Sequence, residues 1–200
     1  CKKNISIYNN IPIISFILLR GKCEHCSEKI SIQYPIIEIA SGLIFLFSFN
    51  YYLSFEIFTF LAISCLLICI AFIDYKHFII PVELFCFLMI FSLLNASISG
   101  NIMYHIYGML IGSSYLLIIL GLTWVFIKKQ PMGFGDILLI VALGLWLGPL
   151  KVLLTIFFSS LVGLLYWGIL SVFKGYKKNR RLPFGSFLSI MSIILYTVKL

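Results

Sequence analysis

Long apolar runs alternate with short polar segments along most of the chain. Seven runs stand out, at residues 36–54, 56–73, 79–98, 104–127, 137–150, 152–173 and 183–199. Most approach the roughly 20 residues that a helix needs to cross the hydrocarbon core of a bilayer. The fifth run has only 14 residues and is short enough to be re-entrant. We predict an all-α fold, a polytopic transmembrane helix bundle with about seven spans.

Composition supports this prediction, because 62% of the residues are hydrophobic and only 11% are charged. A soluble domain of this length is roughly half apolar and a quarter charged. The net charge of +8 is compatible with nucleic-acid binding or with membrane topology. Because the basic residues fall in loops between apolar runs, we interpret them as topology signals and predict no nucleic-acid partner.

The basic residues also predict an orientation. If the N-terminal segment is cytoplasmic and all seven runs cross, thirteen Lys and Arg lie inside and only Lys151 and Lys199 lie outside. A re-entrant fifth run would move the cluster 174–181 outside and weaken this bias. We therefore predict a multi-pass protein of the cell inner (cytoplasmic) membrane, with anionic lipid near its basic face.

The chain divides, on this prediction, into a cytoplasmic cysteine-bearing segment, 1–34, and a transmembrane domain, 35–200. Residues 11–19 are apolar but too short to span. No secretory signal peptide is visible, and because the chain starts at Cys1 we expect further residues upstream.

Asp74 and Asp136 are the only aspartates, and each lies at the end of an apolar run. A carboxylate at a membrane boundary is costly to desolvate and is therefore a functional candidate. The predicted topology places both on the cytoplasmic side. Two carboxyls in one site favour one charged and one neutral member, which suits acid–base hydrolysis. The alternative is two helix-end charges that face the headgroups.

Two glycines, Gly133 and Gly135, leave the backbone around Asp136 uncovered, so a substrate strand could approach there. Two other glycine pairs, 108/112 and 144/148, have the spacing that permits close helix approach in lipid.

Several ordered segments resemble the bacterial type IV prepilin peptidases, which are membrane aspartic peptidases of the Gly-x-Gly-Asp type. The resemblance runs almost from end to end. The segments that carry it are 11–21, Cys23-Glu-His-Cys26, 30–38, Asp74 with Ile80-Pro81, Met132-Gly-Phe-Gly-Asp136, 142–149 and Leu182-Pro-Phe-Gly-Ser-Phe187.

This resemblance implies that Asp74 and Asp136 are the catalytic pair. It implies a membrane aspartic endopeptidase that removes leader peptides from prepilin or pseudopilin precursors at the cytoplasmic membrane face. It also suggests N-methylation of the new N-terminus with S-adenosylmethionine. Two positions depart from the family pattern: Leu138 stands where a Lys is usual, and Val82 where Asp or Asn is common.

Cys23 and Cys26 form a Cys-x-x-Cys pair in a segment where thiols stay reduced. Considered alone, the pair is as compatible with free thiols as with a metal site. The resemblance favours a structural zinc held by Cys1, Cys23 and Cys26, with a fourth ligand upstream or His25 in its place.

Other functions use the same residues. A transporter or proton relay also needs intramembrane carboxylates, although it would place them near the bilayer midplane. A different Gly-x-Gly-Asp membrane peptidase, with another substrate, is the third hypothesis.

Overall fold

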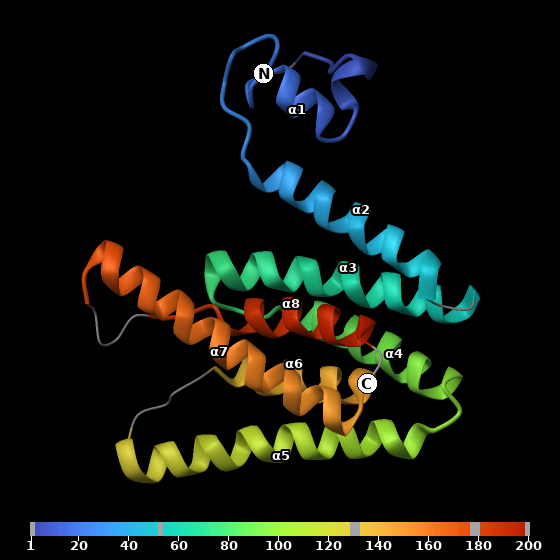
Figure 1. The fold of residues 1–200 in the computed structure, drawn as a ribbon, viewed down its shortest axis with the longest axis vertical. Coiled ribbons are helices and arrows are strands. Elements are labelled where there is room, and N and C mark those ends of the chain that lie inside the picture. The colour runs from blue at the N-terminus through green and yellow to red at the C-terminus, as the bar shows by residue number, and fades with distance from the viewer. Residues whose placement is uncertain (1–2, 52–53, 129–132, 177–180, 199–200) are drawn as a thin grey trace. The chain divides into compact units, whose positions relative to one another are not determined.

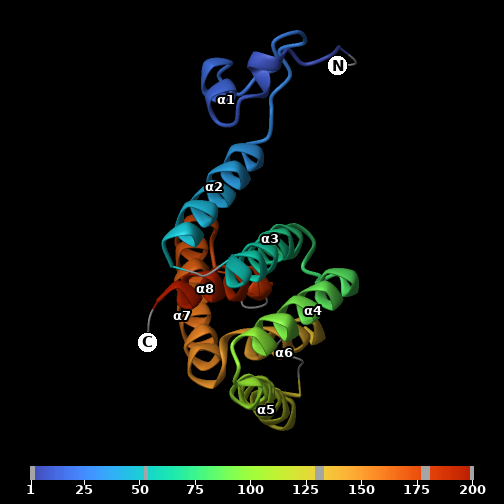
Figure 2. The same cartoon turned by 90° about the vertical axis from the view of Figure 1, so that its right-hand side faces the viewer.

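The computed structural model describes residues 3–51, 54–128, 133–176 and 181–198. The chain divides into two compact units, Cys1–Tyr51 and Tyr52–Leu200. Both units are helical (Figures 1 and 2), and within the described residues the only bridge between extended segments pairs Lys22 with Lys29.

The first unit begins with two very short helices, η1 (Ile7–Asn10) and α1 (Ile14–Leu18). A cysteine-bearing hairpin follows, and then α2 (Gln33–Tyr51). Within the segment 11–19, which is too short to span, the structure has one helix, the five-residue α1. Glu38 of α2 accepts a hydrogen bond from the Ile13 backbone N–H at 2.8 Å, which anchors the start of α1.

The second unit is a bundle of six helices within the described residues. They are α3 (Ser54–His77), α4 (Val82–Ile98), α5 (Ile102–Ile127), α6 (Phe134–Leu147), α7 (Pro149–Lys174) and α8 (Phe184–Thr197). α6 contacts α4, α5, α7 and α8, and α8 contacts α3, α6 and α7. The two 14-residue helices are therefore the central elements, and the longer helices surround them.

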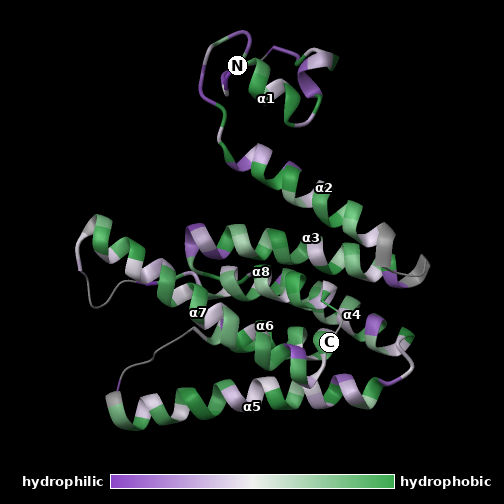
Figure 3. Cartoon of the chain, in the orientation of Figure 1, coloured by the Kyte–Doolittle hydropathy of each residue, from purple (hydrophilic) through white to green (hydrophobic). Residues whose placement is uncertain are grey.

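Apolar residues cover the outer as well as the inner faces of these helices (Figure 3). Large exposed side chains such as Phe126, Phe157 and Val172 would be unfavourable in water, but they suit contact with lipid. Three helices are long and apolar enough to cross a membrane, and four shorter apolar helices accompany them among the described residues. The prediction of an all-α membrane bundle with about seven spans is confirmed.

α6 runs antiparallel to both α5 and α7 (Figure 1), as a crossing helix would and a re-entrant one would not. The C-terminal end of α3 and the starts of α6 and α8 consequently lie at one end of the unit. Lys76 lies in the last turn of α3, Lys128 caps the C-terminus of α5 and Arg181 shortly precedes α8, whereas Lys151 lies in the first turn of α7.

The helix boundaries differ from the apolar runs in three informative places. Asp74 and Asp136 lie inside the last turn of α3 and the first turn of α6, because a single polar residue does not interrupt helical hydrogen bonding. The fifth run was predicted to extend to residue 150, but α6 ends at Leu147. Gly148 has φ +78°, and Pro149 then begins α7 at a position where its missing N–H costs nothing.

Candidate active site

Asp74 is buried in the last turn of α3, with 5% of its surface exposed. Its Oδ2 atom accepts a hydrogen bond from the backbone N–H of Ser186 at 2.7 Å. The Ser186 hydroxyl lies 3.1 Å from the same oxygen. Residues 112 positions apart are thus joined at one carboxylate, which links α3 to the start of α8.

The start of α8 explains this contact. Pro183 precedes the helix and provides no side-chain cap, so the first N–H groups of α8 need another acceptor. Asp74 supplies that acceptor from α3, and its negative charge lies at the positive end of the helix dipole. Gly185 makes the approach sterically possible, because a Cβ there would lie 3.1 Å from both Cγ and Oδ2 of Asp74.

Asp136 is the third residue of α6 and is also buried, with 8% of its surface exposed. Its Oδ2 accepts the Gly133 backbone N–H at 3.3 Å, which caps its own helix. Asp136 therefore has one weak backbone donor, whereas Asp74 has a short backbone donor and a hydroxyl beside it.

Ile80 brings the two helix starts together. A Cβ on Gly135 would lie 3.2 Å from the Ile80 Cβ, and a Cβ on Gly185 would lie 3.1 Å from the Ile80 Cδ1. The loop between α3 and α4 is thus packed against both α6 and α8. The two carboxylates are close enough for the charge of Asp74 to act on Asp136. Among the residues that the structure describes, neither carboxylate has a basic partner within ion-pair distance.

This arrangement can perform acid–base chemistry. Two buried carboxyls within electrostatic range cannot both be charged at low cost, so a shared state with one proton is favoured. The charged carboxylate can take a proton from water, and the neutral carboxyl can donate one to a carbonyl oxygen. Nucleophilic side chains and metal ligands are not needed for such a reaction.

The two glycines beside Asp136 have different surroundings. Gly135 faces Ile80, so its missing side chain makes room for packing. Gly133 is exposed, and a Cβ there would meet only Asp136 Oδ2 at 3.7 Å and Gly135 N at 3.9 Å. Access of a substrate at Gly133 and Gly135 stays a prediction, for which Gly133 is the more open position.

Leu138, the departure from the family's usual Lys, follows Asp136 by two residues. At about 100° per residue the two side chains point to opposite sides of α6. Leu138 is 39% exposed whereas Asp136 is buried. A hydrophobic side chain therefore suits this more exposed position in a membrane bundle.

The cysteine pair lies in the first unit, in a tight hairpin. Cys23 N–H donates to the Glu28 carbonyl and Ser27 N–H donates to the Cys23 carbonyl, both at 2.9 Å. Backbone N–H groups of Cys26 and then His25 are directed at the Cys23 sulfur and lower the pKa of its thiol. The lowered pKa makes the thiolate, which is the form that binds metal, easier to form at Cys23.

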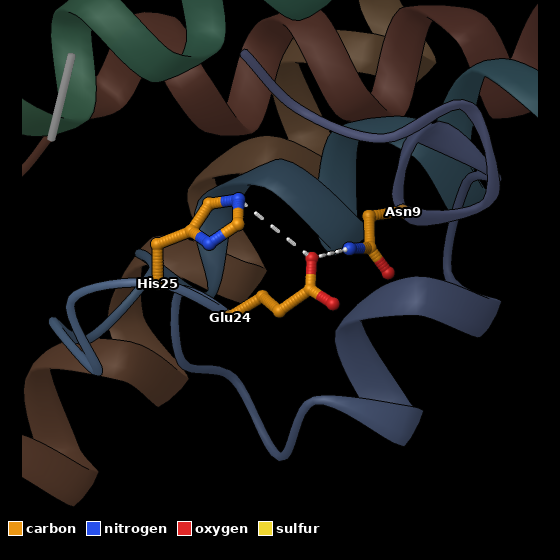
Figure 4. A network of polar contacts seen from close by, with 3 residues as sticks. All are labelled: Asn9, Glu24 and His25. Atoms are coloured by element: carbon orange, nitrogen blue, oxygen red, sulfur yellow. Dashed lines mark hydrogen bonds and ion pairs between the residues drawn. The ribbon is translucent and has the colours of Figure 1, made fainter. Parts of the chain in front are cut away.

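Neighbouring side chains hold this hairpin in place. Figure 4 shows Glu24 between Asn9, which donates a hydrogen bond to it, and His25, whose Nε2 is 4.0 Å from Glu24 Oε2. Cys1 lies outside the described residues. The described part of the chain holds no group of three or more potential metal ligands.

Sequence reasoning missed three residues of the site, namely Ile80, Gly185 and Ser186. All three were noticed only as parts of family-like segments, without a role. A signal for Gly185 and Ser186 exists: they lie just after Pro183, a residue that marks a helix start without a side-chain cap, and such a start attracts an anion.

The fold and this site define a multi-pass membrane protein with a buried aspartate pair at one end of its helix bundle. Residues 60–168 match the Type IV leader peptidase family, and residues 1–52 match the Bacterial Peptidase A24 N-terminal domain. The chain belongs to this peptidase family.

Curated relatives agree along nearly the whole chain. A prepilin leader peptidase/N-methyltransferase from Neisseria gonorrhoeae is 35% identical, over 100% of this chain and 69% of the relative. One with the same name from Xanthomonas campestris pv. campestris is 31% identical, over 94% and 67%. A type 4 prepilin-like proteins leader peptide-processing enzyme from Escherichia coli O78:H11 is 30% identical, over 96% and 71%. No solved structure matches the chain significantly.

Proposed function

We propose that this protein is an aspartic endopeptidase that removes the leader peptide from type IV prepilin-like or pseudopilin precursors at the cytoplasmic face of the inner membrane. The observation that carries the proposal is the meeting of Asp74 and Asp136 at one end of the bundle, both buried and within electrostatic range. The family membership and the names of the relatives support the substrate class.

The hydrogen bonds suggest a role for each aspartate. Donors to a carboxylate stabilise its charged form, and Asp74 has more of them than Asp136. Asp74 would therefore be the base that takes a proton from water, while neutral Asp136 donates its proton to the scissile carbonyl oxygen. The new C–O bond gives a tetrahedral diol. When the C–N bond breaks, the proton held on Asp74 passes to the leaving amine, and Asp136 recovers its proton from the diol.

The substrate fits the inferred topology. A precursor with its leader in the cytoplasm and its apolar stretch in the bilayer would present the scissile bond at the membrane boundary. In the six-helix unit, Lys76 lies in the last turn of α3 together with Asp74, Lys128 caps the C-terminus of α5 and Arg181 shortly precedes α8. These cations suit anionic lipid headgroups at the cytoplasmic surface.

A cleavage assay tests the proposal directly. The purified protein in detergent is mixed with a precursor whose basic leader precedes an apolar segment, and the products are identified by mass spectrometry. We expect one cut, at the junction of leader and apolar segment. An intact precursor, together with proton movement by the protein in liposomes, would favour the transporter hypothesis instead.

N-methylation of the new amine, with S-adenosylmethionine as methyl donor, is a further part of the proposal. Its support is the N-methyltransferase in the names of relatives that cover this chain almost completely. Mass spectrometry of the same product would show an increase of about 14 Da per methyl group.

A structural zinc in the cysteine hairpin is also proposed. Two of the expected donors support it, because Cys23 and Cys26 lie in one turn whose backbone N–H groups lower the pKa of the Cys23 thiol. Together with Cys1 they would provide three ligands. A zinc there would fix the hairpin, and it has no step in the hydrolysis.

Replacing Cys23 or Cys26 by serine is expected to weaken zinc binding. Losing a residue that only hydrogen-bonds to a metal ligand costs about 10–100-fold in affinity, and losing the ligand itself should cost more. Metal analysis of the purified protein measures the bound zinc. The matched control is Cys86→Ser, which changes an exposed thiol on the apolar helix α4. Full zinc retention in the variant that lacks both Cys23 and Cys26 would contradict the site.

A further inference from the structure

We propose that Ser186 is a positioning residue whose hydroxyl holds Asp74 in place in both of its protonation states. The proposal rests on the proposed peptidase function, because only a carboxyl that gains and loses a proton in each cycle needs such a partner. Ser186 is itself buried, with 4% of its surface exposed, at the first turn of α8.

A count of protons leads to this role. The Ser186 Oγ lies 2.7 Å from the Ala71 carbonyl oxygen and 3.1 Å from Asp74 Oδ2. A hydroxyl has one proton to donate and two lone pairs that accept. It cannot donate to both oxygens at once, so the oxygen that receives its proton can change with the state of Asp74.

The Ser186 hydroxyl can form a hydrogen bond with Asp74 in either protonation state. When Asp74 is charged, the hydroxyl proton turns to Oδ2, and the backbone N–H of Ser186 donates to the same atom at 2.7 Å. When Oδ2 carries a proton, Asp74 donates to the Ser186 Oγ, and the hydroxyl proton turns to the Ala71 carbonyl. Only hydrogen atoms move between the two states.

This freedom matters because the site is buried. A buried polar group that loses its partner costs about 1–3 kcal/mol, and a side-chain shift of about 1 Å can cost 10²-fold in rate. A fixed donor alone would suit only the charged carboxylate. The hydroxyl accepts as well as donates, so the carboxyl stays in place while its charge changes.

α8 provides a matched control one turn further on. Ser189 is fully buried, and its hydroxyl donates to the Gly185 carbonyl at 2.8 Å, a bond within the helix. Ser189→Ala therefore removes an equally buried hydroxyl from the same helix without touching Asp74. Ser186→Ala removes the hydroxyl and keeps the N–H donor, whereas Ser186→Thr keeps both.

Steady-state cleavage kinetics give the first test. Ser186→Ala is expected to lower kcat by about 10-fold or more with little change in KM, since the lost contact serves the reacting group and not substrate binding. Ser186→Thr should restore most of kcat, and Ser189→Ala should remain near wild type. Equal kcat for Ser186→Ala and wild type, or failure of threonine to restore it, would overturn the proposal.

Infrared difference spectroscopy gives a second test that needs no cleavage. The carbonyl stretch of protonated Asp74, assigned by its loss in Asp74→Asn, should shift in Ser186→Ala and stay in place in Ser189→Ala. An unchanged band would overturn the role of Ser186. A shifted band in a protein that cleaves no precursor would refute the proposed function and retain the contact.

Discussion

Replacing Asp74 or Asp136 by asparagine is expected to lower kcat for leader cleavage by about 10²–10⁴-fold in each case, which is the range that a positioned acid or base contributes. Asparagine keeps the size of the side chain but can neither take nor supply the required proton. Both positions are buried helix-end carboxyls, so the amide should still accept the N–H donors of Ser186 and Gly133. Cleavage rates and the amount of folded protein in the membrane fraction check this expectation.

The double variant sharpens the test. If the carboxyls act as one unit, losing both should cost little more than losing one, because such effects are not additive. The control is Glu83→Gln, which removes an exposed carboxylate from the first turn of α4, close in sequence to Ile80. Cleavage near the wild-type rate in either single aspartate variant would eliminate the pair as the catalytic centre.

The helices could be predicted from sequence because lipid imposes a simple rule on them. Every backbone polar group in the bilayer core needs an internal partner, so a long apolar run must be helical. The seven runs and the seven apolar helices therefore correspond one to one among the described residues. The ends were less accurate: the apolar runs stop one residue short of Asp74 and of Asp136, whereas the helices α3 and α6 extend past them.

The aspartates could be singled out because carboxylates are rare in apolar runs, and loop charges alone indicated a common face. Their roles as the catalytic pair stay predictions. The contact with Ser186 could not be foreseen, since no periodicity relates residues 112 positions apart. Ile80 was equally hidden, because its importance comes from the two glycines on different helices that face it.

The N-terminal segment shows a different limit. The hairpin that presents Cys23 and Cys26 depends on local backbone hydrogen bonds, and a Cys-x-x-Cys spacing already suggests such a turn. A zinc site also needs ligands from further away, and Cys1 lies outside the described residues. The boundary between a segment 1–34 and a domain 35–200 stays a prediction as well.

The close contact between α5 and α6 leads to the second large expected effect. A Cβ on Gly144 would lie 2.5 Å from the Gly108 carbonyl oxygen and 2.8 Å from the Met109 Cα. These are backbone atoms, so no side chain can turn aside and the helices must separate. Gly144→Ala is therefore expected to destabilise the bundle by about 1–3 kcal/mol, the usual cost of overpacking. Thermal unfolding in detergent measures the loss.

Gly121→Ala is the matched control on α5, because nothing lies within 4 Å of a Cβ at that position. The same methyl group should there leave stability unchanged or raise it slightly, since alanine favours helix over glycine. The damage from Gly144→Ala should also reach the active site, because α6 carries Asp136 at its other end. Equal unfolding temperatures for the two variants would show that α5 and α6 are not held together through these glycines.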